Sequence, residues 1–106
     1  MNVVSDKVKA LVQLEYEADC KDHGPLASLH EGYAVLLEEM QETDDSLGWI
    51  KWYLDNIWNG IKQNDAMGAV NGARLCKTWA EQCACEAIQV AAVCKRIADL
   101  EVKDGN

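Results

Sequence analysis

The most unusual chemical position in this sequence is that of Glu86, inside a helical pattern that begins near Ala66. A helix turns by about 100° per residue, so the residues that share the face of Glu86 follow from spacing alone. Six apolar side chains lie within about 40° of Glu86: Leu75, Trp79, Val90, Val93, Ile97 and Leu100. Gln82 and Gln89 share the same inward half. A carboxylate there must be protonated, paired with a cation or bound to a metal, because its desolvation is expensive.

A second group of carboxylates, Glu38, Glu39 and Glu42, lies in the helical pattern that follows Ser28. Glu39 and Glu42 are three residues apart, so they point to one side of the helix. Glu39 borders the predicted buried face, which is marked by Leu29, Tyr33, Leu36 and Met40. Clustered carboxylates repel one another, and a cation among them relieves that repulsion. A solvated acidic face and a hydrogen-bonded structural Glu86 are the alternatives, but the two groups together favour a metal site.

The donor types indicate which metal the site would take. Carboxylate and amide oxygens suit Mg²⁺, or alternatively Mn²⁺, and do not suit zinc. A di-iron bundle needs Glu-x-x-His pairs, and neither His23 nor His30 follows a glutamate at that spacing. Cys83 and Cys85 lack the further cysteines or histidine of a zinc site. Because the five cysteines are odd in number and no secretion signal is present, they are predicted to be buried free thiols.

The spacing of apolar residues predicts helices over almost all of the first half of the chain. Ser5 and Asp6 are predicted to cap a first helix that ends near Cys20, and Lys21–Pro25 is predicted to break it. Ser28 and Glu31 form a capping box for a second helix that runs at least to Gln41. That helix either continues through residues 42–46 or gives way to a new helix capped by one of Asp44, Asp45 and Ser46.

The second half of the chain continues this pattern. Its next apolar stripe consists of Leu47, Ile50, Leu54, Ile57 and Ile61. Asn64–Asp65 predicts a turn, and a long helix is expected from Ala66 to about Val102, with a possible interruption at Asn71–Gly72 and fraying over residues 104–106. The predicted fold is therefore an all-α antiparallel helical bundle, with three to four helices plus a long C-terminal helix, in a single domain over residues 1–106.

The charge balance excludes several classes of partner. The 106 residues include 18 acidic and 10 basic side chains, for a net charge of -8. Such a surface disfavours direct binding to nucleic acid and to an anionic membrane. No run of 18 apolar residues is present and the N-terminus lacks the pattern of a signal peptide, so a cytoplasmic protein is expected.

The segment His30–Glu42 resembles the first motif of the MazG-like nucleotide pyrophosphohydrolases, which belong to the all-α NTP pyrophosphatase superfamily. The hallmark of that family is Glu-Glu-x-x-Glu on one helix and Glu-x-x-Asp on a later helix. Residues 85–93 are similar to the second motif, with Gln89 in place of the Asp. The similarity is greatest to small members found in bacteriophages and prophages. The 43 residues between Glu42 and Glu86 exceed the typical family spacing.

The resemblance implies an activity and a set of roles. Family members cleave a nucleoside triphosphate to the monophosphate and pyrophosphate. By correspondence of motifs, Mg²⁺ would be held by Glu39, Glu42, Glu86 and Gln89, while Glu38 would position or deprotonate the attacking water. Gln89 carries no charge, so a lower metal affinity is expected. The alternative is a degenerate, non-catalytic member, possibly phage-derived, that serves as an oligomeric helical interaction protein.

Several further residues have a functional and a structural interpretation. Trp49 and Trp52 are candidates for stacking on a base, or else for the core or a subunit interface. His30 would orient substrate or water, or merely cap its helix. Lys95 and Arg96 would meet phosphates, or else complement the helix dipole as exposed cations. A surface of small residues predicts a homodimer or homotetramer, and it consists of Ala80, Ala84, Ala87, Ala91, Ala92 and Ala98.

Overall fold

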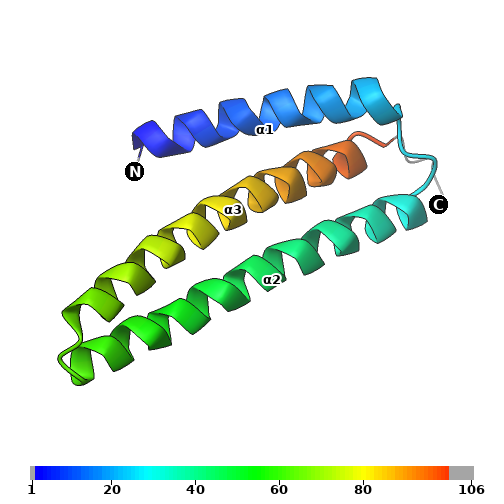
Figure 1. Ribbon diagram of the computed structural model, residues 1–106. Helices are drawn as coiled ribbons and strands as arrows, with labels where there is room; N and C mark the ends of the chain where they lie inside the picture. Colours follow the sequence, from blue (N-terminus) through cyan, green and yellow to red (C-terminus); the bar gives the residue numbers. More distant parts are fainter. Residues whose placement is uncertain (1, 101–106) are drawn as a thin grey trace. The chain divides into compact units, whose positions relative to one another are not determined.

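A computed structural model describes residues 2–100, which form three α-helices in an all-α helical bundle (Figure 1). The helices are α1 (Asn2–His23), α2 (Leu29–Lys62) and α3 (Ala66–Ala98). The fold class is as predicted, but the long C-terminal helix is itself one of the three helices. The described residues divide into two compact units: the first consists of residues 2–40 and 87–100, and the second of residues 41–86.

Two of the predicted helix boundaries are confirmed by backbone geometry. The Ser28 hydroxyl accepts a hydrogen bond from the Glu31 amide at 3.1 Å, which caps α2. At the turn between α2 and α3, Asn64 has a positive φ of 57°. The Asp65 carboxylate then accepts a hydrogen bond from the Gly68 amide at 2.9 Å and caps α3.

Both ends of α1 differ from the predictions. Helix α1 begins before Ser5 and Asp6, and it ends at His23, where Gly24 takes the left-handed backbone (φ 68°) that closes many helices. Of the two alternatives for residues 42–46, the continuous helix is the one observed in α2, and α3 is not interrupted at Asn71–Gly72. These polar residues do not end the helices, because burial of one side of each segment outweighs their weak local preference for turns. The predicted end at Val102 and the fraying of residues 104–106 lie outside the described residues.

The second unit is an antiparallel pair formed by the later part of α2 and the earlier part of α3 (Figure 1). Its inward positions recur at alternating intervals of three and four residues, the period of a coiled coil. On α2 they are Thr43, Ser46, Ile50, Tyr53, Ile57 and Gly60. On α3 they include Gly72, Cys76, Trp79, Cys83 and Glu86.

In the first unit the start of α2 approaches the end of α3, and the Tyr16 hydroxyl of α1 donates to the Asp99 carboxylate just after α3. Gly32 is buried, and a Cβ atom at this position would lie 2.7 Å from the Ile97 side chain, so the absence of a side chain allows the two helices to approach closely. The predicted buried face of α2 is wrong: Leu29, Tyr33 and Met40 are 55%, 65% and 45% exposed. The packed face is rotated by about 60° from the predicted one, because it follows Gly32, Leu36 and Glu39 and shares only Leu36 with it.

Candidate functional site

Glu86 lies at an inward position of α3 in the second unit, and both of its carboxylate oxygens accept hydrogen bonds. Ser46 Oγ donates to Oε2 at 2.9 Å, and Gln82 Nε2 donates to Oε1 at 2.9 Å. The side chain is half-buried, whereas that of Ser46 is only 2% exposed. Within residues 2–100 these partners of Glu86 are both neutral, so they orient the carboxylate without neutralising it. Such an oriented, anionic oxygen pair suits the binding of a cation.

The surroundings of Glu86 form a polar layer in the helix pair. One turn away, the Cys83 thiol lies 4.0 Å from the Thr43 carbonyl oxygen and donates to it. Nearer the α2–α3 turn the inward positions become apolar or aromatic, with Ile50, Tyr53 and Ile57 on α2. Because a buried polar pair is satisfied in only one register, the Ser46–Glu86 bond also helps to align the two helices.

The other predicted metal ligands are divided between the two units. Glu42 belongs to the second unit; it is exposed and lies one turn before Ser46 on α2. Glu38, which is exposed, and Glu39 and Gln89, which are half-buried, belong to the first unit. Within residues 2–100, no group of three or more histidine, cysteine, aspartate or glutamate side chains is arranged to hold a metal ion. Carboxylate and amide oxygens are the donor types that Mg²⁺ takes in proteins, where one or two carboxylates are usually supplemented by water.

Ser46 is the residue of this arrangement that the sequence analysis missed. It was interpreted only as a helix cap, because serine is rare inside helices and follows two aspartates. The available signal was its spacing: Ser46 precedes Ile50 by four residues and Tyr53 by seven, so all three share one face. Gln82 was placed on the inward half of α3, but no role was assigned to it.

An aromatic cluster lies further along the second unit. Trp49 stacks on Trp79, with ring centroids 5.6 Å apart and planes at 17°, and Trp52 meets Tyr53 edge-on at 4.9 Å. Trp49 and Trp52 are both exposed, so neither is a core residue of the chain as described. Trp52 also lines a cavity of about 160 Å³ together with Asp55, Asn56 and Asn59. An open ring face beside two amides is a surface that can stack on a planar ligand and hydrogen-bond to its edge.

The remaining candidates lie in the first unit. His30 is exposed in the first turn of α2 and lines an open cavity with Leu29 and Tyr33. Lys95 lies 3.8 Å from the Asp99 carboxylate and 4.5 Å from the centre of the Tyr16 ring. Arg96 is not the exposed cation that was expected, since it is only 9% exposed. The connection between α1 and α2 covers it, and its guanidinium donates to the Gly24 carbonyl at 3.1 Å.

The cysteines depart from the prediction in their burial. All five are free thiols, as expected. Cys20, Cys76 and Cys83 are half-buried, but Cys85 and Cys94 are exposed, so the prediction of buried thiols is wrong for these two. Both lie on the side of α3 away from its inward positions, next to Glu86 and Val93 in sequence.

Tyr16 has a titration that can be tested. Its hydroxyl donates to the Asp99 carboxylate, and this bond, followed by its contact with Cys20, raises the pKa of Tyr16 above its ordinary value near 10. A pKa raised by folding stabilises the native state below the unfolded value, and that stability is lost as the pH rises through the folded value. We expect urea unfolding to show a steeper loss of stability above about pH 10 in the wild type than in Tyr16→Phe. Equal slopes would contradict the hydrogen bond.

Comparison of the chain with protein-family models, with curated proteins and with solved structures found no match in any of the three. A separate search of residues 2–100 found no helix with the length and apolar character needed to cross a membrane. The function is therefore inferred from the side chains of this protein and from the two glutamate motifs.

Proposed function

We propose that the protein is a Mg²⁺-dependent nucleoside triphosphate pyrophosphohydrolase. The observation that carries the proposal is Glu86, an inward, half-buried carboxylate whose hydrogen-bond donors are both neutral. Ser46 and Gln82 hold its two oxygens in one orientation, as the supporting residues of a metal ligand do. The Glu-Glu-x-x-Glu spacing on α2 supports the same chemistry, and the resemblance to the MazG-like enzymes supplies the reaction.

The proposed roles follow from residue type and position. Glu86 and Glu42 would hold Mg²⁺, and the resemblance adds Glu39 and Gln89 as further oxygen donors. A bound Mg²⁺ would neutralise charge on the phosphate oxygens, which a protein of net charge -8 does not otherwise attract. Glu38 takes a proton from a water molecule that attacks the α-phosphorus. The bond from that phosphorus to the α,β-bridging oxygen breaks, which yields the monophosphate and pyrophosphate.

The aromatic cluster provides a surface for the base in this proposal. The exposed Trp52 side chain lies beside the amides of Asn56 and Asn59, and all three belong to about two turns of α2. Amide groups both donate and accept hydrogen bonds, so they can read the edge of a base that stacks on the indole. Trp49, which stacks on Trp79, also meets the Trp52 ring edge-on at 6.2 Å and so links this surface to α3.

The test is an assay of the purified chain with the common ribo- and deoxyribonucleoside triphosphates in the presence of Mg²⁺. We expect monophosphate and pyrophosphate in equal amounts from at least one nucleotide, loss of both products with EDTA, and partial recovery with Mn²⁺. Release of orthophosphate instead of pyrophosphate, or of no product from any nucleotide, would contradict the proposal.

A second candidate function is favoured by exposed apolar side chains. In the second unit Leu47, Leu54, Trp58 and Ile61 form an exposed stripe on α2, at the spacing with which a coiled coil meets a partner helix. Exposed stripes of this kind mark association surfaces, so a non-catalytic homodimer or homotetramer that acts as an interaction protein is the alternative. An assembly seen by sedimentation equilibrium, without pyrophosphate release from any nucleotide, would favour it over the enzyme.

A further inference from the structure

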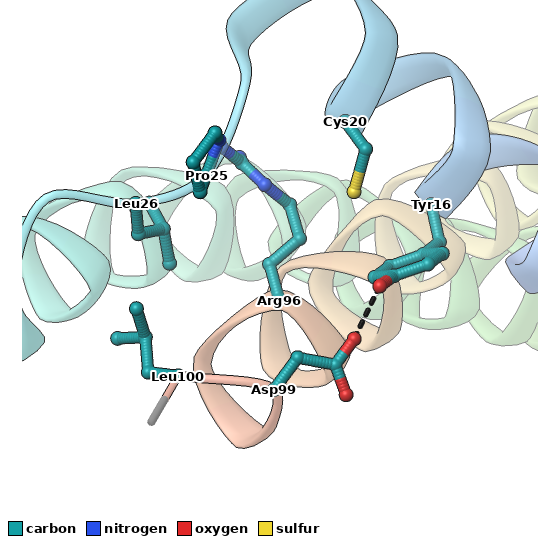
Figure 2. Close-up of a pocket in the computed structure, with 7 residues that line it drawn as sticks. All are labelled: Tyr16, Cys20, Pro25, Leu26, Arg96, Asp99 and Leu100. Carbon is teal, nitrogen blue, oxygen red and sulfur yellow. Dashed lines mark hydrogen bonds between the residues drawn. The ribbon is translucent and has the colours of Figure 1, made fainter. Parts of the chain in front are cut away.

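The first unit contains a cavity of about 90 Å³ that the proposed hydrolase chemistry does not use. Figure 2 shows how three parts of the chain surround it: Tyr16 and Cys20 come from α1, Pro25 and Leu26 from the connection, and Arg96, Asp99 and Leu100 from the end of α3 and the residues after it. Pro25, Leu26 and Leu100 make part of the wall apolar. The guanidinium of Arg96 extends from α3 toward Pro25 (Figure 2).

Arg96, which lines this cavity, has a side-chain hydrogen-bond donor without a partner. Arg96 as a whole is 9% exposed. One of its terminal nitrogens, Nη2, donates to the Gly24 carbonyl at 3.1 Å. Its Nε atom is buried and has no hydrogen-bond partner among residues 2–100. A buried donor without a partner is unfavourable, and one on a charged group more so, because its hydration has been lost. The position therefore calls for an acceptor that the described residues do not supply.

The charges around the cavity favour an anionic acceptor. Asp99 is the one carboxylate among its lining residues, and the Tyr16 hydroxyl donates to this carboxylate (Figure 2). The same carboxylate lies 3.8 Å from Lys95 Nζ. Arg96 is the one cation among the lining residues, and it has no carboxylate within ion-pair distance among residues 2–100. The Cys20 thiol is a further weak donor in the wall.

We propose that this cavity binds a small oxyanion, of the phosphate or carboxylate class, that accepts a hydrogen bond from Arg96 Nε. Arginine presents its nitrogen donors in a planar fork that matches both kinds of oxyanion, and the site is partly withdrawn from water, which strengthens the bond. The apolar wall limits the ligand to a compact ion or to a single charged group of a larger molecule. This inference does not depend on the proposed hydrolase activity, because it uses none of the same residues.

The chain contains only two arginines, which gives the experiment an internal control. Arg74 is exposed and donates to Asn71 within α3, so it represents a solvated guanidinium. In the full-length ¹⁵N-labelled protein, the Nε–H resonances of both arginines would be followed by NMR during titration with sodium phosphate, sulfate or acetate at constant ionic strength. Sodium chloride serves as the reference salt.

We expect the Arg96 resonance to shift in a saturable manner with at least one oxyanion, while that of Arg74 stays unchanged. A stronger response to phosphate and sulfate than to acetate would assign a tetrahedral anion, and the reverse would assign a carboxylate. Parallel shifts of both arginines, or no shift of Arg96 with any anion, would overturn the proposal. In thermal unfolding, the stabilisation by the effective anion should be lost in Arg96→Lys and retained in Arg74→Lys. If Arg96→Lys does not fold, the wild-type NMR titration decides the question alone.

Discussion

Replacing Glu86 with glutamine is expected to lower the rate of pyrophosphate release by about 100-fold or more, because one charge that would hold the cation is removed. The substitution keeps the size and shape of the side chain. Its hydrogen bonds can also be kept, since the Ser46 hydroxyl can accept as well as donate and the Gln82 amide can turn over. The variant should therefore fold, and the activity loss should not arise from unfolding.

The matched control for this experiment is Glu81→Gln. Glu81 lies on the same helix, is exposed, and pairs with Lys77 at 3.3 Å on the outward face. An exposed pair of this kind contributes little to stability, so the control should retain both activity and fold. Melting curves with and without Mg²⁺ give a second measurement, since an ion that binds the native state raises the melting temperature. Wild-type activity in Glu86→Gln would show that Glu86 is a structural residue.

The largest expected effect on stability comes from Gly60→Ala. An added Cβ atom at Gly60 would lie 2.9 Å from the backbone nitrogen of Ala69, closer than such atoms normally approach. Backbone cannot rotate away as a side chain can, so the two helices would have to separate next to their connecting turn. We expect a loss of about 2 kcal/mol in the free energy of unfolding, within the usual range for overpacking.

Gly48→Ala is the control, because it makes the same chemical change on the same helix. At Gly48 an added Cβ atom has no neighbour within 4 Å. Alanine is the better helix former, so this variant should gain about 0.5–1 kcal/mol. Urea unfolding followed by circular dichroism would measure both variants. A Gly60→Ala protein as stable as Gly48→Ala would show that α2 and α3 do not approach closely at Gly60.

The helical class, the cap at Ser28, the turn at Asn64–Asp65 and the inward position of Glu86 could all be predicted from residue order. Each depends on interactions within a few residues or on the period of one helix, and these are set by local chemistry. The same reasoning gave the wrong buried face for α2. That helix carries apolar side chains on two adjacent stripes, and periodicity alone does not show which stripe meets a neighbour.

Which of the two stripes of α2 is buried depends on where α3 approaches it, and these two helices are distant in sequence over most of their length. Gly32 and Gly60 lack side chains, so α3 packs along their face of α2, and Leu54, Trp58 and other apolar residues stay exposed. Ser46, which donates a hydrogen bond to Glu86, lies forty residues before it in the sequence. Gly24, whose carbonyl accepts a hydrogen bond from the buried Arg96, lies seventy-two residues before that arginine. No local pattern encodes such pairings, because they arise only when burial of whole helix faces brings the segments together.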